Sequence, residues 1–457
     1  MKTKKVMNRF YYIFIFFTLV FYSCNKIDNF TSSGVEILVP NGNENYINQP
    51  SDSLFNQNNL PVLEINLPEN ALAYIDADPA AEEYVEGSLT YNGETISPIG
   101  IRYKGSIGAF VEGVSGNDWS NPSGSKTATK LSMKFKIDWK GFHSTFYDLK
   151  TIQLHSMNLD NSQMHDRLGY WLFRKMDVPA PRCIHAKLYI NGEFNGVFAL
   201  IEQIDEQFIK YNFLESSGNL YKEVWPLKSN NSVQTDRKLY EGLVSNRQTG
   251  VNINIIKNFA QNIVNASDSE IQTVLENHMN LEQSIALAVV DRSIRNDDGP
   301  FHWYCGWGGC EPHNFFWYEN PSTIKVHLIP WDLDNAFENI ITNTNPVTPI
   351  ADVWGDTTNN CQAFEYGSWG MYQKSAACDR ITGGLARYDS KYQQLKDSLI
   401  NGPMSEHTVN TLIDLWANQI RNATIEADEQ HNDALRLSNW ENSIIELKTQ
   451  LEYARNK

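Results

Sequence analysis

Acidic residues in apolar surroundings constrain this chain most, and they fall in two groups between residues 291 and 334. The first group, at 297–298, follows an apolar helix-like run. The second, Asp332 and Asp334, directly follows a strand-like run, and Asn314 lies between the groups. Buried carboxylates need partners, and Asp and Asn oxygens suit Mg²⁺ or Mn²⁺ completed by phosphate oxygens. We therefore predict a metal site, with solvated turns and helix caps as the alternative.

The N-terminus has the pattern of a targeting segment. A basic start leads into an apolar run that ends at Ser23 and is too short to span a membrane comfortably as a mature helix. A small residue before Cys24 resembles a bacterial lipobox. We predict a signal peptide over 1–23 and a lipid on Cys24, so that the mature chain is membrane-anchored outside the cytoplasm, in the periplasm or at the cell surface. Ordinary cleavage with an incidental cysteine is the alternative.

Residues 24–60 are rich in Asn, Ser and Pro and predict a flexible tether. The formal net charge of −16 argues against binding to nucleic-acid phosphates and favours a soluble acidic surface. The sequence does not indicate an oligomeric state.

Cysteine spacing suggests two local disulfides in an oxidising compartment. The sequence-local pairings are Cys305 with Cys310 and Cys361 with Cys378, leaving Cys183 over. Sequence alone does not determine the connectivity, and a structural zinc site is a weaker interpretation because C-x₂-C spacing is missing.

The order of predicted elements indicates an α+β fold. The clearest helix covers 160–176 and ends at a Pro-rich segment. A hairpin follows, formed by 186–190 and 196–201 around Asn191-Gly192. Strands are predicted at 63–67, 84–91, 99–104 and 131–137, and later helices at 253–264, 268–278, 281–293, 392–400, 409–425 and 435–455. This order predicts a sheet-rich first lobe and a mainly helical second lobe.

Residues 154–209, LHSMNLDNSQMHDRLGYWLFRKMDVPAPRCIHAKLYINGEFNGVFALIEQIDEQFI, resemble the spore coat protein H (CotH) kinase family. Further matching pieces are GIRYKGS (100–106), TKLSMKFKID (129–138), GNLYK (218–222), PHNFFWYE (312–319) and IPWDLDNAF (329–337). The resemblance implies an atypical protein-kinase-like, two-lobed fold with ATP in the cleft. It implies a small lobe with one long helix and the hinge over 61–205, a large lobe with the metal and catalytic loops over 206–390, and a helical C-terminal extension of the large lobe over 391–457.

The resemblance also implies roles for individual residues. Asp298 is similar to the catalytic-loop aspartate, which orients or deprotonates the acceptor hydroxyl. Asn314 and Asp332 resemble the metal ligands of the family, and Asp334 is a possible second acidic ligand.

The nucleotide contacts follow from the same resemblance together with strand alternation. Lys134 is the first choice for the α- and β-phosphates because it lies on the face of its strand opposite the apolar residues. Asp166 falls where the family often has Glu and could pair with that lysine, and 202–203 resembles the adenine-binding hinge. The full set of expected nucleotide contacts is Lys134, Lys130, Lys104, Asp166, Glu202 and Gln203. Arg167 and Arg182 are either phosphate contacts or structural ion pairs, and we favour the structural interpretation.

One departure from the family pattern bears on activity. Asp298 and Asn314 are 16 positions apart, with a Gly-, Trp- and Cys-rich insertion at 299–313, whereas kinase catalytic loops hold the equivalent pair close together. A disulfide between Cys305 and Cys310 could fold the insertion back so that the ligands converge. Alternatively the insertion displaces them and leaves a non-catalytic binding protein.

Three functions are therefore weighed. The first is an extracytoplasmic kinase that uses ATP with Mg²⁺ or Mn²⁺ to phosphorylate Ser or Thr of a surface or secreted protein. The second is a surface binding or adhesion protein on the same fold. The third is a metal-independent glycan hydrolase that uses Asp298 and Asp332 as its carboxylate pair.

Overall fold

The computed structural model describes residues 50–457, except 106–108, 111, 117, 119–120, 249, 307–308, 338–339, 342–353 and 367–370. The expected signal peptide, the lipid site at Cys24 and most of the tether lie outside these residues. The tether prediction is wrong for 50–60. Helix α3 (Pro50–Leu54) is formed there, and Leu54 and Phe55 are fully buried in the core of the first half. These two apolar side chains and the hydrogen bonds of Ser51 and Asp52 with Arg182 hold this segment, and the surrounding Asn and Ser residues conceal them in the sequence.

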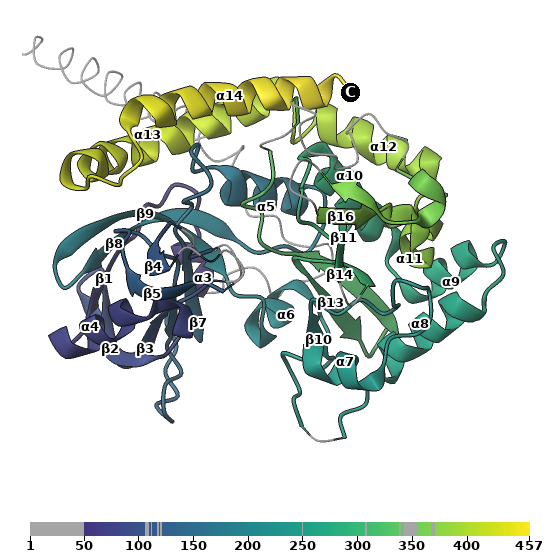
Figure 1. The fold of residues 1–457 in the computed structure, drawn as a ribbon, viewed down its shortest axis with the longest axis horizontal. Helices are drawn as coiled ribbons and strands as arrows, with labels where there is room; N and C mark the ends of the chain where they lie inside the picture. The colour runs from purple at the N-terminus through teal and green to yellow at the C-terminus, as the bar shows by residue number, and fades with distance from the viewer. Residues whose placement is uncertain are drawn as a thin grey trace, which may run out of the picture. The chain divides into compact units, whose positions relative to one another are not determined.

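The first half of the chain forms a closed barrel with strand order β1–β2–β3–β6–β7–β9–β8, visible at the lower left of Figure 1. Its strands are β1 (Val62–Asn66), β2 (Val85–Tyr91), β3 (Glu94–Tyr103), β6 (Met133–Lys136), β7 (Thr151–His155), β8 (Cys183–Ile190) and β9 (Glu193–Glu202). Neighbours are antiparallel except β1 and β8, whose parallel pairing closes the barrel. Closure pairs both edges of the sheet and buries one face of every strand. Helix α4 (Glu69–Ala77) packs against β2 of the barrel. It also packs against β5 (Ser123–Lys126), which forms a hairpin with β4 (Val114–Gly116).

Helix α5 (His165–Lys175) packs against β8 of the barrel and against α10 (Leu281–Ser293) of the second half. It begins later than the predicted residue 160. The carboxylate of Asp160 accepts the backbone N–H groups of residues 162, 163 and 165, which holds a turn ahead of the helix. Nearly every α5 side chain is buried, so the helix connects the two halves through its packing.

The second half contains more strand than predicted. Strands β10 (Leu220–Lys222), β13 (Phe315–Asn320) and β14 (Lys325–Pro330) form one sheet. A second sheet has the order β12–β11–β16–β15 and combines β11 (Trp303–Gly306), β12 (Gly309–Pro312), β15 (Phe364–Tyr366) and β16 (Met371–Lys374). The α+β class is confirmed, and the second half has more helix than strand, as predicted, although β11 of the insertion pairs with the distant β16. The helices there are α6 (Glu206–Asn212), α7 (Asp236–Gly242), α8 (Asn254–Asn265), α9 (Ile271–His278), α10 and α11 (Arg380–Leu385).

The C-terminal helices α12 (Asp389–Asn401), α13 (Glu406–Gln430) and α14 (Leu437–Arg455) do not form an extension of the second half alone. Helix α12 packs on α10, but α13 packs on β9 of the barrel (Figure 1). The indole of Trp440 donates to the carbonyl of Ser162 at 3.1 Å. The segment expected as a helical extension of the large lobe, 391–457, therefore also packs on the barrel. Within the described residues, no helix combines the length and apolarity that a membrane span needs.

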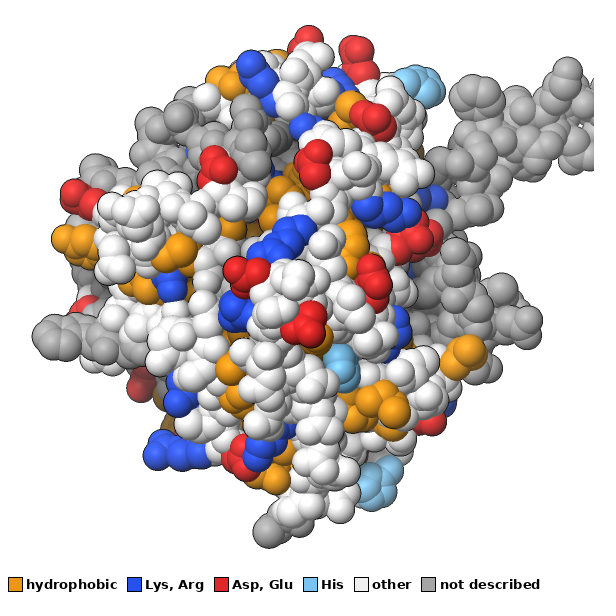
Figure 2. Space-filling view, turned by 90° about the vertical axis from the view of Figure 1, so that its right-hand side faces the viewer, with side chains coloured by type: hydrophobic (Ala, Val, Ile, Leu, Met, Phe, Trp, Pro, Cys, Tyr) orange, Lys and Arg blue, Asp and Glu red, His pale blue; other side chains and the backbone are white. Residues whose placement is uncertain are grey.

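The surface carries both signs of charge. Figure 2 shows acidic and basic side chains interspersed over the face that it presents, with apolar side chains scattered between them. Although the formal net charge is negative, basic side chains lie among the acidic ones on this face.

Candidate active site

Four side chains from separate elements meet where the barrel faces the second half. Lys104 follows β3, His155 ends β7, Asp166 lies in the first turn of α5, and Asp332 follows β14. The Lys104 Nζ lies 2.5 Å from His155 Nε2. His155 Nδ1 lies 3.2 Å from Asp166 Oδ2 and 3.7 Å from Asp332 Oδ1. Potential ligand atoms of the histidine and the two aspartates all fall within 4.8 Å of one another, which is a spacing that one metal ion can occupy.

The backbone at this site has unusual conformations. Glu223, Asn314 and Asp332 have φ angles of 50°, 53° and 51°, in the left-handed region. Such conformations cost free energy and cluster at functional sites. The turn at Asp332 is held from α5: its N–H donates to Tyr170 Oη at 2.9 Å, and the N–H of Leu333 donates to Asp166 Oδ1 at 3.3 Å.

The long insertion does not separate Asp298 from Asn314. The Asn314 Nδ2 donates to Asp298 Oδ2 at 2.7 Å. Between them β11 and β12 form a hairpin crosslinked by a Cys305–Cys310 disulfide. The same asparagine accepts the N–H of Trp331 at its carbonyl, 3.0 Å away, which connects it to the segment that carries Asp332.

The neighbouring aspartate is directed elsewhere. The N–H of Asp297 donates to the carbonyl of Asn335 at 3.4 Å, and its carboxylate lies 3.9 Å from Arg295 Nε. Of the first acidic pair, Asp298 is therefore the member that joins the site. A second disulfide joins Cys361 and Cys378, and Cys183 is a free, buried thiol.

The carboxylates at this site repel one another. Burial, and after it the charges of Asp332 and Glu223, raises the pKa of Asp298 to about 7. Burial and the charges of Asp332 and Asp166 raise the pKa of Asp334 well above its usual range. For Asp166 burial acts in the same direction, but His155 and the Leu333 N–H outweigh it and lower the pKa. This surplus of negative charge in a partly buried site is what a divalent cation would relieve.

The structure changes the order of the candidate lysines. Lys104, not Lys134, reaches the site, where its Nζ contacts His155 beside Asp166 and Asp332. Lys134 lies on β6 opposite Arg102 of β3, and burial together with repulsion from Arg102 and Lys104 lowers its pKa to about 8. Lys130 is directed elsewhere, with its Nζ 5.0 Å from the centre of the Phe198 ring. Sequence alternation placed Lys134 on the polar face correctly, but it could not show which neighbouring strand end approaches the aspartates.

The adenine-binding hinge expected at 202–203 stays a prediction, but the side chain of Glu202 is used for another purpose. Its carboxylate is buried in an ion pair with Arg182, at 2.7 Å from Nη2 and 3.1 Å from Nε. Asp52 of α3 accepts a further bond from the same guanidinium at 2.7 Å. Gln203 donates from Nε2 to the carbonyl of Ile204 at 3.0 Å. The carboxylate of Glu202 is thus used to hold the barrel and α3 together.

Arg167 is also structural. Its guanidinium donates to Gln57 and to Gln419 Oε1, and it lies 2.8 Å from His185 Nδ1. It also stacks over Trp416 of α13, with the guanidinium carbon 4.5 Å from the ring centre. Both arginines therefore follow the structural interpretation that the sequence favoured.

Three residues of the site escaped the sequence analysis: His155, Tyr170 and Glu223. His155 ends β7, a strand that the sequence analysis did not predict, so no sequence pattern singled it out. Glu223 follows the short strand β10, and no sequence motif marks it as a site residue. Its Oε1 accepts the N–H of Asn314 at 3.3 Å, a contact between segments far apart in sequence.

Acidic side chains from several elements, gathered beside a lysine at the junction of a barrel and a mixed second half, define an α+β protein with a candidate metal-dependent active site. The CotH kinase protein family model matches residues 101–456. The chain belongs to this family, which confirms the resemblance seen in the sequence.

A second comparison identifies a more distant relative. The inner spore coat protein H of Bacillus subtilis (strain 168) is 22% identical over 206 residues. The matched region is 43% of this chain and 54% of that protein, so the chain spans about half the length of the curated relative that it matches.

Proposed function

We propose that this chain is an atypical protein kinase that transfers the γ-phosphate of ATP to Ser or Thr of a protein outside the cytoplasm. The observation that carries the proposal is the convergence of Asp298, Asn314 and the Asp332 turn despite the insertion. Asn314 contacts both of the others, through its side-chain amide to Asp298 and through its carbonyl to the segment before Asp332. In this proposal the barrel is the small lobe and the second half is the large lobe.

The donor set fits Mg²⁺ or Mn²⁺. Asp332 and Asn314 would hold the ion, with Asp334 as a possible further ligand, because these hard oxygen donors match both cations. Burial, and after it the repulsion between the carboxylates, raises the pKa of Asp334 and Asp298, which supports a cation here. When bound, the ion would neutralise phosphate charge, which is its usual contribution to phosphoryl transfer.

The remaining roles fall to the side chains themselves. Lys104 is placed to bind phosphate oxygens, since its Nζ contacts His155, which lies beside Asp166 and Asp332. Asp298 would orient the acceptor hydroxyl and take its proton, and a pKa near 7 leaves a substantial ionised fraction at neutral pH. Asn314 holds that carboxylate through a 2.7 Å hydrogen bond, so that one oxygen has a defined orientation.

The compartment and the acceptor are part of the same proposal. The N-terminal pattern supports export and a lipid anchor at Cys24. The matched relative is named as an inner spore coat protein. A surface or secreted protein with accessible Ser or Thr is therefore the acceptor class that we propose, with membrane attachment through the lipid and no nucleic-acid partner.

The test is phosphate transfer from radiolabelled ATP by the mature chain from residue 25, with Mn²⁺ or Mg²⁺ present. We expect autophosphorylation by the wild type and its loss in Asp332→Ala. Asp298→Asn should abolish transfer while retaining ATP binding, because it removes the base but no expected metal ligand. Asp397→Asn, on the outer helix α12, is the control and should be active. A wild type that neither binds ATP nor labels itself would replace this proposal with the binding-protein function.

A further inference from the structure

We propose that His155 is a positioning residue that links Lys104 to Asp166 in place of a direct lysine–acid pair. Its effect on nucleotide binding rests on the function proposed above. His155 contacts both of the other side chains, with Lys104 Nζ at 2.5 Å from one ring nitrogen and Asp166 Oδ2 at 3.2 Å from the other. Imidazole carries two nitrogens on opposite sides of one rigid ring, so it can make both contacts at once.

The donors and acceptors determine the tautomer. Burial lowers the pKa of Lys104, and the charges of Asp332 and Asp166 act against this. As an ammonium Lys104 has three N–H donors and no acceptor, so in the arrangement that we propose His155 Nε2 accepts from it. The ring proton of the neutral imidazole is therefore on Nδ1, which donates to Asp166 Oδ2. In this arrangement Nδ1 is a donor, and His155 supports the metal ligands without being one.

The ring is held in this orientation by its surroundings. His155 is buried, at 6% exposure, and packs edge-on against Trp331 with ring centres 5.8 Å apart. Lys104 Nζ lies 5.6 Å from the centre of the same indole ring. Trp331 directly precedes Asp332, so the indole places both members of the link beside the segment that carries the metal ligand.

A bridge is required here because Asp166 is committed on its other side. Its Oδ1 accepts the N–H of Leu333 at 3.3 Å, which fixes the carboxylate toward the Asp332 turn. Aspartate is also one methylene shorter than the glutamate expected at this helix position. The imidazole spans the remaining gap. The result is a continuous connection from β3, through β7 and α5, to the backbone of the turn at Asp332.

The connection assigns two consequences to one side chain. Removing the imidazole leaves Lys104 without the partner that directs its Nζ toward the phosphates. It also leaves Asp166 with one hydrogen bond fewer, so its grip on the Leu333 N–H weakens. If His155 served only for packing, a longer acid at position 166 would not restore what its removal takes away.

The first experiment measures ATP affinity by calorimetry in the presence of Mn²⁺. His155→Ala should weaken ATP binding on the order of 10- to 100-fold, the range expected for losing one charge-assisted hydrogen bond. The double variant His155→Ala/Asp166→Glu should recover at least a third of that loss on a logarithmic scale, because the longer acid reaches toward Lys104. His143→Ala is the matched control: this histidine also lies 3.2 Å from an aspartate, Asp138, but at the exposed surface.

The second experiment needs no nucleotide. Histidine labelled with ¹⁵N should show a neutral His155 ring protonated at Nδ1, assigned by its disappearance in His155→Ala. Hydrogen exchange of the Leu333 amide should be at least several-fold faster in that variant and unchanged in His143→Ala.

Three results would overturn the proposal: ATP affinity of His155→Ala within twofold of wild type, a ring proton on Nε2, or an unchanged Leu333 exchange rate. Loss of Mn²⁺ binding in His155→Ala, with no recovery in the double variant, would make His155 a metal ligand and also overturn it. If the wild type binds no ATP, the proposed function fails, while the tautomer and the exchange rate still decide whether the link exists.

Discussion

The disulfide between Cys305 and Cys310 lies inside the insertion that separates Asp298 from Asn314, and its removal should slow phosphate transfer. The bond joins residues five positions apart and thus closes a loop of about six residues. The chain-entropy model gives such a loop about 2 kcal/mol. If all of it held the hairpin closed over the site, removal would lower the rate about 30-fold, at about 1.4 kcal/mol per factor of ten.

The actual loss should be smaller, because β11 remains paired with β16 through residues 303–305. We expect Cys305→Ser/Cys310→Ser to reduce the initial rate of autophosphorylation by about 3- to 30-fold. The fall should appear in kcat more than in the KM for ATP, because the hairpin positions Asp298 and Asn314 and not Lys104.

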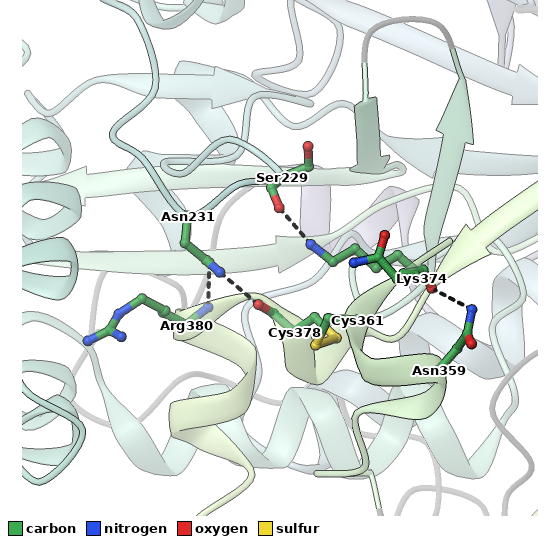
Figure 3. Close-up of a disulfide and its surroundings, with 8 residues drawn as sticks. Ser229, Asn231, Asn359, Cys361, Lys374, Cys378 and Arg380 are labelled. Carbon is green, nitrogen blue, oxygen red and sulfur yellow. Dashed lines mark hydrogen bonds between the residues drawn. A yellow bond between two sulfur atoms is a disulfide. The ribbon is translucent and has the colours of Figure 1, made fainter. Parts of the chain in front are cut away.

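The second disulfide provides a matched control. Cys361 and Cys378 close a longer loop, for which the same model gives about 3 kcal/mol. Figure 3 shows this bond beside the start of α11, where Asn231 donates to the carbonyl of Cys378 and accepts the N–H of Arg380. Cys361→Ser/Cys378→Ser should lose more stability in guanidinium unfolding but keep its rate within about threefold of wild type.

The two double variants together show whether the Cys305–Cys310 disulfide acts on the site or only on the stability of the fold. A rate that falls in proportion to lost stability in both would mean that the disulfides act only on the fold. An unchanged rate in Cys305→Ser/Cys310→Ser, with the absence of the crosslink verified by mass spectrometry, would show that strand pairing alone holds Asp298 beside Asn314.

Three further predictions concern stability. Glu202→Gln leaves the buried Arg182 guanidinium without its main carboxylate and should cost about 3 kcal/mol in guanidinium unfolding, whereas Glu86→Gln at an exposed ion pair should change little. Burial raises the pKa of Asp291 to about 7 from its usual 3.8, so the folded state favours the protonated acid. The contribution of this carboxyl group to stability is therefore complete below about pH 4 and is lost as the pH rises through 7. The unfolding free energy of Asp291→Asn should therefore fall less than that of wild type between these pH values. Mn²⁺ at about 100 times its dissociation constant should add about 2.7 kcal/mol to the unfolding free energy, and Asp332→Asn should remove this gain; a gain that persists would place the ion elsewhere.

Much of the fold is local enough to be predicted. Alternating apolar residues identified most of the barrel strands but missed β7 (Thr151–His155), and Asn191-Gly192 identified the turn between β8 and β9. Each signal depends on neighbours within a few residues, where the pleat or the turn geometry constrains residue type directly. The start of α5 and the residues after Pro50 were missed, because a capping carboxylate and a pair of core side chains contribute little to a compositional average.

Part of the site was also visible in the sequence. Asp298, Asn314 and Asp332 were identified from their acidic or amide character and from motifs at strand ends. The position of Asp166 was identified from the helix that carries it. The neighbours of these residues were not. His155 and Glu223 join the site through contacts made across the junction of barrel and second half, and such contacts leave no periodic trace.

The sequence by itself therefore determined which residues bear the acidic chemistry, most of the barrel strands and the later helices, and which cysteines are close enough to pair. Only the tertiary structure decided that Lys104 contacts His155 beside the acids while Lys134 does not, that Glu202 pairs with Arg182, and that α13 packs on the barrel. The reason is physical: residue type and local periodicity are properties of short segments, whereas the partner of a side chain depends on how the barrel closes and which strand ends it brings together.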